Sequence, residues 1–291
     1  MTLAAPLTAR DQSPLLRWAG GKRWLGGALR EVGRLVEPTS YIEPFVGGAA
    51  VFLATYWPNP VLGDVNNALI RCYRGLADDP AKVRSTLESY EVDEATYKRI
   101  ASWRPRSAAG EAARLLYLNR TSYGGIYREN RAGQFNVPFS GDRTLELLLR
   151  GSRLEDAAIA LSQAKLVQGD FETSLEGARG KSLIYCDPPY SLLGGERGFR
   201  RYSQLPYTWA DQERLARKLG GLAANGNTVV LSNSADESIQ SLYPSAQVIV
   251  TSRKSPLAKS GHVEQKEAVY VLHADDVTAA ALAGRVASAV Q

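Results

Sequence analysis

Short apolar segments alternate with longer segments of helical periodicity along most of the chain. Strands are predicted at residues 40–43, 60–64, 165–170, 182–187, 228–232, 247–251 and 267–273. Helices are predicted at 23–36, 49–56, 67–76, 154–161, 211–224 and 235–242. Alternation of this kind favours a Rossmann-like α/β fold, in which a mostly parallel sheet is covered by helices on both faces.

The alternation lapses between about residues 75 and 153. This stretch is mainly helical and then rich in Tyr, Arg, Asn and Gly, which predicts an inserted module at 76–153 within a sheet domain of 1–75 and 154–291. The last two predicted strands are separated by a short loop, so we expect an antiparallel hairpin at one edge. The alanine-rich end, 275–291, predicts a surface helix or a frayed tail.

Composition limits the class of protein. The 291 residues are 44% hydrophobic and 22% charged, as in ordinary globular proteins. No apolar run approaches the roughly 20 residues of a membrane span, and residues 1–13 lack a signal-peptide core and predict a short flexible lead. Two cysteines, Cys72 and Cys186, favour a reducing cytoplasm over a disulfide framework. His262 and His273, without a Cys-x-x-Cys pair, form no zinc pattern, and we expect no metal.

Charge gives a mild indication of a polyanionic partner, because 35 Lys and Arg residues stand against 30 acids. The distribution is more informative, because basic residues gather after three separate predicted elements. Each cluster alone is most simply solvated surface charge, but three together favour a face that binds a polyanion. The clusters are Arg114, Arg120, Arg128 and Arg131; Arg197, Arg200 and Arg201; and Arg253, Lys254 and Lys259.

The most informative stretch is Asp187-Pro188-Pro189-Tyr190, directly after the apolar run 183–186. Proline has no N–H to donate to a ladder, so the strand must end at Asp187. That end presents a carboxylate, a backbone carbonyl and an aromatic ring, at the edge where open α/β sheets bind ligands. Two acceptors beside a ring suit a planar base with an exocyclic amine. A proline-rich turn with Asp187 as turn former explains the tetrapeptide equally well by itself.

Other predicted strands also end in groups that suit a nucleoside-like ligand. Glycines in 43–48 would let the backbone approach a ligand, although a structural turn is the alternative. Asp64 would suit ribose hydroxyls or would cap the next helix, as Asn66 could. Asp170 and Phe171 would hold an adenine by its amine and its face. Upstream, Trp18 and Lys22 could pack a ligand and pair with a carboxylate.

The ordered motifs resemble a known family. Trp-Ala-Gly-Gly-Lys at 18–22, Glu-Pro-Phe-Val-Gly at 43–47, Asp-Val-Asn at 64–66 and Asp-Pro-Pro-Tyr at 187–190 are similar to Dam-type, D12-class DNA adenine N6-methyltransferases. Within the insertion, segments 116–120, 123–125 and 133–139 and Arg128 are similar to that family's target-recognition module. The resemblance extends from about Leu15 to His273, nearly the whole chain.

The resemblance implies S-adenosyl-L-methionine as cofactor and a residue-by-residue site. The implied cofactor residues are Trp18 and Lys22 in the pocket, Glu43, Pro44, Phe45 and Gly47 around the methionine part, Asp64 at the ribose, and Asp170 with Phe171 at the adenine. The implied target-base residues are Asp187, Pro188, Pro189 and Tyr190.

For DNA, the resemblance implies methylation of a flipped adenine in a duplex, at GATC or a related site. Tyr123 would fill the gap left by the flipped base, and Ile126, Arg128 and Pro138 would read base edges. Arg120 and Asn136 complete the implied DNA-binding set. We expect a monomer, with no membrane partner and with a restriction endonuclease as the protein partner in a restriction-modification setting.

The chain departs from the family pattern at three places. Ala49 replaces a glycine, which is tolerated if its φ is negative, as we expect. Glu129 follows Arg128 where the family has tyrosine, and a carboxylate there would repel phosphates unless it pairs or accepts from a cytosine amine. Residues 259–261, Lys-Ser-Gly, replace a Ser-Asn-Gly loop.

Three alternatives remain open from the residues. Some RNA methyltransferases that act on the guanine N2 amine also use Asp-Pro-Pro-Tyr. A cytosine N4-methyltransferase is less well matched, since that group has serine in place of Asp187. A DNA-binding module without catalysis is the alternative that is not an enzyme.

Overall fold

A computed structural model describes residues 14–18, 20–55, 57–130, 132–141, 144–190, 207–254 and 264–290, with the backbone alone at 252–254 and 264–266. Several predictions lie outside the described residues or side chains. They concern the lead 1–13, His262, the loop 259–261, and the side chains of Arg131, Arg197, Arg200, Arg201, Arg253, Lys254 and Lys259.

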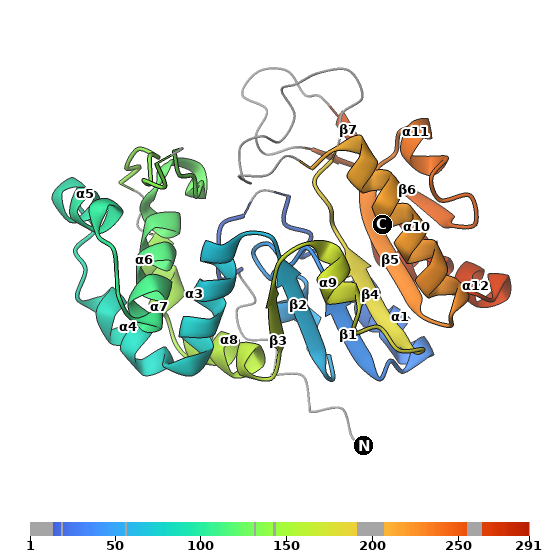
Figure 1. Ribbon diagram of the computed structural model, residues 1–291, viewed down its shortest axis with the longest axis horizontal. Helices are drawn as coiled ribbons and strands as arrows, with labels where there is room; N and C mark the ends of the chain where they lie inside the picture. Colours follow the sequence, from blue (N-terminus) through green and yellow to red (C-terminus); the bar gives the residue numbers. More distant parts are fainter. Residues whose placement is uncertain are drawn as a thin grey trace.

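The described strands form one seven-stranded sheet in the order β3-β2-β1-β4-β5-β7-β6 (Figure 1). The pairings among β1 to β5 are all parallel, whereas β7 is antiparallel to both β5 and β6. The mostly parallel sheet and the antiparallel hairpin at one edge are thereby confirmed. The strands are β1 Ser40–Glu43, β2 Pro60–Asp64, β3 Lys165–Gln168, β4 Ser182–Cys186, β5 Thr228–Ser234, β6 Gln247–Lys254 and β7 Glu264–Leu272.

The central strands are buried on both faces, which explains their continuous apolar sequence. In β4, Leu183 and Tyr185 point into one apolar cluster, while Ile184 and Cys186 point into another. All five residues of β4 are buried. Since side chains alternate along a strand, the two clusters lie on opposite faces of the sheet.

Helices cover both faces, as the alternation predicts. One cluster takes residues from α1 Leu25–Val36, α2 Phe52–Thr55, α3 Asn67–Asp78, α8 Arg153–Ser162 and α12 Asp276–Val290. The other takes residues from α9 Phe171–Leu175, α10 Trp209–Ala224 and α11 Glu237–Gln240. The chain end is a helix rather than a frayed tail, because α12 buries Ala279, Leu282 and Val286. Among the described residues, no helix has the length and apolarity to cross a membrane.

The predicted insertion is mainly helical. It contains α4 Pro80–Glu88, α5 Glu94–Ser102, α6 Ala108–Thr121, the short η1 Tyr123–Gly125 and α7 Thr144–Leu149, which lie on the left in Figure 1. Gly75 of α3 approaches α6 so closely that an added Cβ would lie 2.1 Å from the carbonyl oxygen of Ala108. The apolar core runs without interruption from the sheet into these helices, so the division into two domains stays a prediction.

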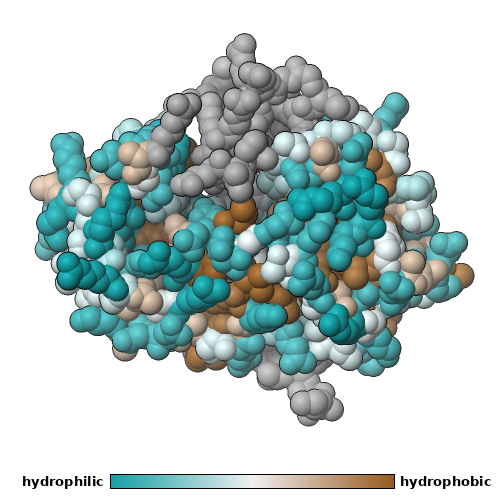
Figure 2. Space-filling view, viewed as in Figure 1, coloured by the Kyte–Doolittle hydropathy of each residue, from teal (hydrophilic) through white to brown (hydrophobic). Residues whose placement is uncertain are grey.

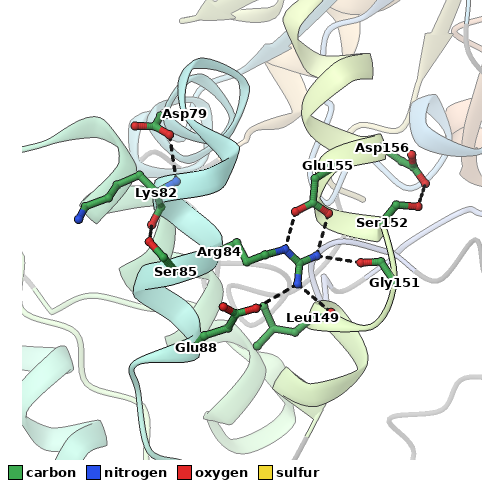
Figure 3. A network of polar contacts seen from close by, with 10 residues as sticks. All are labelled: Asp79, Lys82, Arg84, Ser85, Glu88, Leu149, Gly151, Ser152, Glu155 and Asp156. Carbon is green, nitrogen blue, oxygen red and sulfur yellow. Dashed lines mark hydrogen bonds and ion pairs between the residues drawn. The ribbon is translucent and has the colours of Figure 1, made fainter.

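Arg84 ties the beginning of the insertion to its end (Figure 3). Its guanidinium donates to both carboxylate oxygens of Glu155 on α8 and, at 2.9 Å each, to the carbonyls of Leu149 and Gly151. The ion pair lowers the pKa of Glu155. One side chain thus closes the loop of chain between α4 and α8.

The outer surface over these elements is mostly hydrophilic. Figure 2 shows hydrophilic side chains over the inserted helices and over α10, with a hydrophobic area between them near the centre of the view. The large apolar side chains of the two clusters therefore lie mainly inside, as the alternating pattern predicts.

The packing of α1 on Trp57 generates a prediction. An added Cβ at Gly33 would lie 2.0 Å from the Trp57 ring, whereas one at Gly27 in the same helix meets nothing within 4 Å. We expect Gly33→Ala to destabilise the protein by about 1–3 kcal/mol through overpacking. Gly27→Ala should stabilise it by up to about 1 kcal/mol through helix propensity.

Urea unfolding of the two variants beside the wild type measures this difference. Equal stabilities for Gly33→Ala and Gly27→Ala would contradict the described contact between α1 and Trp57.

Candidate functional site

The candidate site lies at the carboxyl ends of the parallel strands. Strands β1 and β4 are neighbours, and the strand order runs outward from them in both directions, so they form the switch point of the sheet. Glu43 ends β1, Asp64 ends β2, and Asp187 follows β4 directly. Asp170 follows β3 after one glycine. The structure brings these four predicted carboxylates to one edge.

Asp187 is held by partners from two other elements. Its Oδ1 accepts a hydrogen bond from the Ser232 hydroxyl of β5 at 2.8 Å and lies 3.6 Å from Lys22 Nζ. Burial raises the pKa of Asp187 to about 6, and the Lys22 charge and the Ser232 bond oppose that rise. At neutral pH, Asp187 is therefore a carboxylate that can accept hydrogen bonds.

The Pro-Pro turn after Asp187 is anchored from α10. Gln212 Nε2 donates to the Pro189 carbonyl at 3.3 Å, while Gln212 Oε1 accepts from Asn233 Nδ2 of β5 at 3.2 Å. Gln212 and Asn233 are fully buried. Pro188 is buried, and Pro189 and Tyr190 are half-buried. Neither Gln212 nor Asn233 was predicted from the sequence. For Asn233, the polar residues that end the apolar run of β5 could have indicated a functional position.

Lys22 is a buried cation at the same edge, with 5% exposure. Besides Asp187, its Nζ lies 3.3 Å from Glu267 of β7 and donates to the Gly20 carbonyl at 2.9 Å. It also lies 5.1 Å from the centre of the Tyr190 ring, a cation–π distance. Both partners of Lys22 are protein carboxylates, and Glu267 was not foreseen, because it comes from a distant part of the chain.

Glu43 is almost entirely buried, with 3% exposure, and accepts a hydrogen bond from the Tyr41 hydroxyl at 2.7 Å. Burial raises the pKa of Glu43 to about 8; the Tyr41 bond lowers it, and the charge of Asp187 raises it further. In the ligand-free protein at neutral pH, this carboxyl is mainly protonated.

The glycine turn after β1 is tied to the end of β2. Gly47, at φ +44°, donates its N–H to Asp64 Oδ2 at 3.0 Å, and the Asn66 N–H donates to Asp64 Oδ1 at 2.9 Å. Asn66 caps α3 by accepting from the Leu69 N–H at 3.3 Å. The cap therefore belongs to Asn66, and Asp64 orders the turn. Burial raises the pKa of Asp64 to about 6.

Trp18 packs directly on this turn. An added Cβ at Gly47 would lie 3.1 Å from the indole, and one at Gly48 would lie 2.8 Å from Trp18 Cβ. An added Cβ at Gly63 would lie 1.9 Å from Ser174 Oγ and 3.5 Å from the buried Pro44. Small residues are required here because the Trp18 and Ser174 side chains lie directly against the backbone.

The expected negative φ of Ala49 is wrong. Ala49 is fully buried and has φ +53°, a left-handed conformation that Gly47 also adopts two residues earlier. This conformation costs an L-residue roughly 1–2 kcal/mol. The strained turn also delays the following helix, so α2 begins at Phe52 rather than at the predicted residue 49.

Asp170 and Phe171 are adjacent as predicted but already engaged. Asp170 caps α9 by accepting from the Glu172 N–H at 3.0 Å, and Arg214 of α10 donates to its two carboxylate oxygens at 3.1 and 2.7 Å. The Arg214 guanidinium lies 4.4 Å from the centre of the Phe171 ring, and the half-buried Phe45 lies 5.5 Å from it on ring centres. A ligand that stacks on Phe171 must share this space with Arg214.

Five of the six predicted DNA-binding residues lie on one irregular two-stranded ribbon. Isolated bridges pair Ser122 with Phe139 and Glu129 with Phe135. The exposed Arg128 donates to the Oδ1 of the exposed Asn136 at 2.8 Å. The ribbon carries Tyr123, which is 52% exposed, the half-buried Ile126, Arg128, Asn136 and the exposed Pro138.

Two arginines of the first basic cluster are buried instead of facing a polyanion. Arg120 is 5% exposed and donates to the carbonyls of Leu15 and Pro14. Arg114 is 7% exposed and donates to the carbonyls of Ile100 and Ala101. For these two residues, the predicted polyanion-binding surface is wrong. Their long side chains satisfy backbone carbonyls where chain segments cross.

Glu129, the acid that departs from the family pattern, is tied down. It accepts a hydrogen bond from the buried Tyr127 hydroxyl at 2.9 Å, and that hydroxyl also accepts from Arg114 Nη1 at 3.2 Å. The Glu129 carboxylate is therefore held within the ribbon by the Tyr127 hydroxyl, which is itself hydrogen-bonded to Arg114.

Asn119 joins the ribbon to the segment that carries Trp18. It is fully buried, exchanges 2.8 Å hydrogen bonds with the N–H and carbonyl of Arg17, and donates to the Gly125 carbonyl at 2.6 Å. An added Cβ at Gly125 would lie 2.4 Å from Arg17 Cβ. The sequence placed Asn119 within a motif but did not identify this bridging role.

The site chemistry rests on hydrogen-bond acceptors, one buried ammonium and aromatic rings. No group of three or more His, Cys, Asp or Glu side chains that could hold a metal occurs in the described part of the chain. The arrangement can hold a planar amine against Asp187 and Tyr190, and polar ligand groups along the ends of β1 and β2.

Comparison with known proteins gives a consistent result. Residues 18–256 match the model for the D12 class N6 adenine-specific DNA methyltransferase. The chain is 31% identical over 242 residues to the Type II methyltransferase M1.LlaDCHI of Lactococcus lactis subsp. cremoris, covering 79% of this chain and 84% of that protein. It is 30% identical to the Type II methyltransferase M.MjaIII of Methanocaldococcus jannaschii, covering 77% and 85%. It is also 30% identical to the DNA adenine methylase of Vibrio cholerae, covering 87% and 92%.

The raised pKa of Glu43 generates a prediction about stability. A carboxyl whose folded pKa exceeds its unfolded value of roughly 4.3 contributes stability at low pH that is lost as pH rises through the folded pKa. Asp64 and Asp187 reach the midpoint of their titration in the folded protein near pH 6, whereas Glu43 reaches it at about pH 8. Between pH 6.5 and 8, Glu43→Gln should therefore flatten the decline, which for one such group approaches about 1.4 kcal/mol per pH unit.

Thermal unfolding of the ligand-free protein across this pH range measures the slope. Glu155→Gln is the matched control, because the lowered pKa of Glu155 leaves it ionised in both states over this range. Identical slopes for wild type and Glu43→Gln would contradict the assignment of a protonated Glu43.

Proposed function

Because this chain belongs to the D12 class of N6 adenine-specific DNA methyltransferases, we propose that it methylates a flipped adenine in duplex DNA with S-adenosylmethionine as donor, at GATC or a related site. The observation that carries the proposal is the position of Asp187. Its carboxylate ends β4 beside Tyr190 and is fixed by Ser232 and Lys22.

The residues at the strand ends fit the proposed cofactor. Asp64 would accept from ribose hydroxyls while the glycine turn keeps its backbone close to the ligand. Glu43 and Lys22 offer an acid and a cation to the amino and carboxylate groups of the methionine part. Asp170 would share its carboxylate between Arg214 and the adenine amine. When bound, S-adenosylmethionine supplies an electrophilic methyl group on a sulfonium.

The chain's own residues would prepare the target amine. The N6 lone pair is delocalised into the adenine ring, so the nitrogen is a weak nucleophile. Asp187 and the Pro188 carbonyl would accept the two N6 hydrogens and favour a more tetrahedral nitrogen. Tyr190 would stack on the base, and the Gln212 bond to Pro189 would keep the turn in place. Catalysis then rests on position and electrostatics.

The product must lose one N6 proton, and Asp187 would accept it. Its pKa of about 6 leaves the carboxylate ionised and able to accept a proton at neutral pH. The same value allows Asp187 to release the proton to water before the next turnover.

Base flipping makes N6 accessible, since this amine cannot be reached inside a duplex. Tyr123, half exposed on the ribbon, would fill the gap in the stack. Arg128 would read a guanine edge: Asn136 accepts from its Nε and Nη2, and the outer hydrogens of Nη1 and Nη2 would make the bidentate contact to the base. Ile126 and Pro138 would add contacts to base edges. Arg120 would support the ribbon from beneath.

The proposed setting is a reducing cytoplasm, where the buried cysteines Cys72 and Cys186 stay free. We expect a monomer acting on double-stranded DNA. Two relatives are named Type II methyltransferases, which supports a restriction endonuclease of the same specificity as a functional partner.

Replacing Asp187 tests the chemistry. We expect Asp187→Ala to bind S-adenosylmethionine but to lose methyl transfer to duplex DNA by at least about 100-fold. Transfer of tritiated methyl groups, with ribosomal RNA as a second substrate, measures the loss and separates the DNA proposal from an RNA methyltransferase.

Asp156→Ala is the matched control, because Asp156 accepts from the Ser152 hydroxyl at 2.9 Å, much as Asp187 accepts from Ser232, but lies on α8 (Figure 3). Wild-type transfer by folded Asp187→Ala would refute the mechanism.

Replacing Arg128 tests the recognition. Loss of a bidentate contact to guanine is worth about 1–3 kcal/mol, so Arg128→Ala should relax one guanine position of the site by roughly 5-fold to 150-fold. Methylation of a duplex library with each base of the site varied measures this change. Arg179→Ala, an exposed arginine between α9 and β4, should leave the preference unchanged. Unaltered discrimination in Arg128→Ala contradicts its assignment.

A further inference from the structure

Glu267 reaches the site from the last strand of the sheet. Strand β7 runs antiparallel to β5, so the beginning of β7 lies beside the end of β5, where Glu267 pairs in register with Ser234. Its carboxylate contacts Lys22 Nζ at 3.3 Å, on the same ammonium that Asp187 contacts at 3.6 Å. The two carboxylates thus flank one nitrogen.

The charges in this group do not balance. Lys22 is 5% exposed, and the side chains of Asp187 and Glu267 are 20% and 18% exposed, so solvent screens them incompletely. In the part of the chain whose side chains are described, the ion pairs of this cluster join one ammonium to two carboxylates. Counted over these three described side chains, the cluster carries one negative charge in excess.

We propose that Glu267 provides this excess charge and thereby makes the site prefer a cationic sulfonium donor over the neutral thioether product. The inference rests on the proposed function. Methyl transfer breaks the sulfur–methyl bond and forms the N6–methyl bond. The bonding pair returns to sulfur, which becomes neutral, and N6 releases a proton. Donor and product share the same amino, carboxylate, ribose and adenine groups, so their affinity ratio reports the potential at sulfur.

Without Glu267, Lys22 would act against the chemistry in two ways. Its charge would be compensated by Asp187 alone, which would engage the acceptor that N6 needs. The remaining pair of Lys22 and Asp187 would also be neutral overall. No excess negative charge would then offset a sulfonium near the Lys22 ammonium, which lies 5.1 Å from the Tyr190 ring. Glu267 acts through Lys22, so we assign it as a positioning residue.

The test compares the affinities of two ligands that differ in charge. Isothermal titration gives the dissociation constants of S-adenosylmethionine and S-adenosylhomocysteine for wild type and Glu267→Gln. We expect the preference for the donor to fall by about threefold to tenfold, because one nearby negative charge is removed. Glu267→Asp should retain the preference, and sinefungin, which carries an ammonium in place of the sulfonium, should weaken together with the donor.

Glu155→Gln is the control for loss of an ion-paired carboxylate, because Glu155 pairs with Arg84 on α4 (Figure 3). It should leave the affinity ratio unchanged.

Two results would overturn the inference: an unchanged ratio in Glu267→Gln, or an equal loss of affinity for both ligands. If Glu267→Gln fails to fold by circular dichroism, Glu267→Ala takes its place in the comparison. A wild type that binds neither ligand would refute the proposed function and the inference with it. A wild type that binds both and methylates DNA while the ratio stays fixed refutes the inference alone.

Discussion

Several carboxylates meet at one edge of the parallel sheet, and the elements around them are arranged to offset the cost of withdrawing these groups from water. Strands that end together bring Glu43, Asp64 and Asp187 close to one another, and each buried carboxyl needs its own donor. The Tyr41 hydroxyl, the N–H of the glycine turn and Ser232 with Lys22 provide these donors. The raised pKa values of all three acids show that burial outweighs this compensation. The glycine turn is part of this compensation through its bond to Asp64, Trp18 packs on that turn, and Glu267 shares Lys22 with Asp187.

The site and the ribbon of the insertion are physically continuous. Asn119 binds both the Arg17 backbone and the Gly125 carbonyl, and Arg120 holds the carbonyls just before Arg17. The segment that brings Trp18 to the glycine turn is therefore the same segment on which the ribbon rests. Under the proposed function, this shared support keeps the reading residues in a fixed position relative to the base pocket. Coupling between the reading residues and the base pocket then requires no additional contact between domains.

The sheet, its hairpin and the edge where Asp187 lies could be predicted from the sequence, because these features follow from short-range patterns such as alternation and paired prolines. It failed where the outcome depends on tertiary contact. No local pattern shows that Arg114 and Arg120 turn inward to carbonyls, that Arg214 covers Phe171, or that Glu267 meets Lys22 from the far end of the chain. The φ of Ala49 was mispredicted because alanine's own preference for a negative φ is overridden in the turn after β1, where Ala49 is fully buried.

Whether this chain methylates adenine in DNA can be measured by single-molecule sequencing of DNA from cells that lack adenine methylation and express the chain, because the method reports the modified base together with its sequence context. The account predicts N6-methyladenine at one short motif, GATC or a close relative, and its disappearance with Asp187→Ala. DNA without N6-methyladenine, accompanied by methylated guanine in the ribosomal RNA of the same cells, would contradict the account.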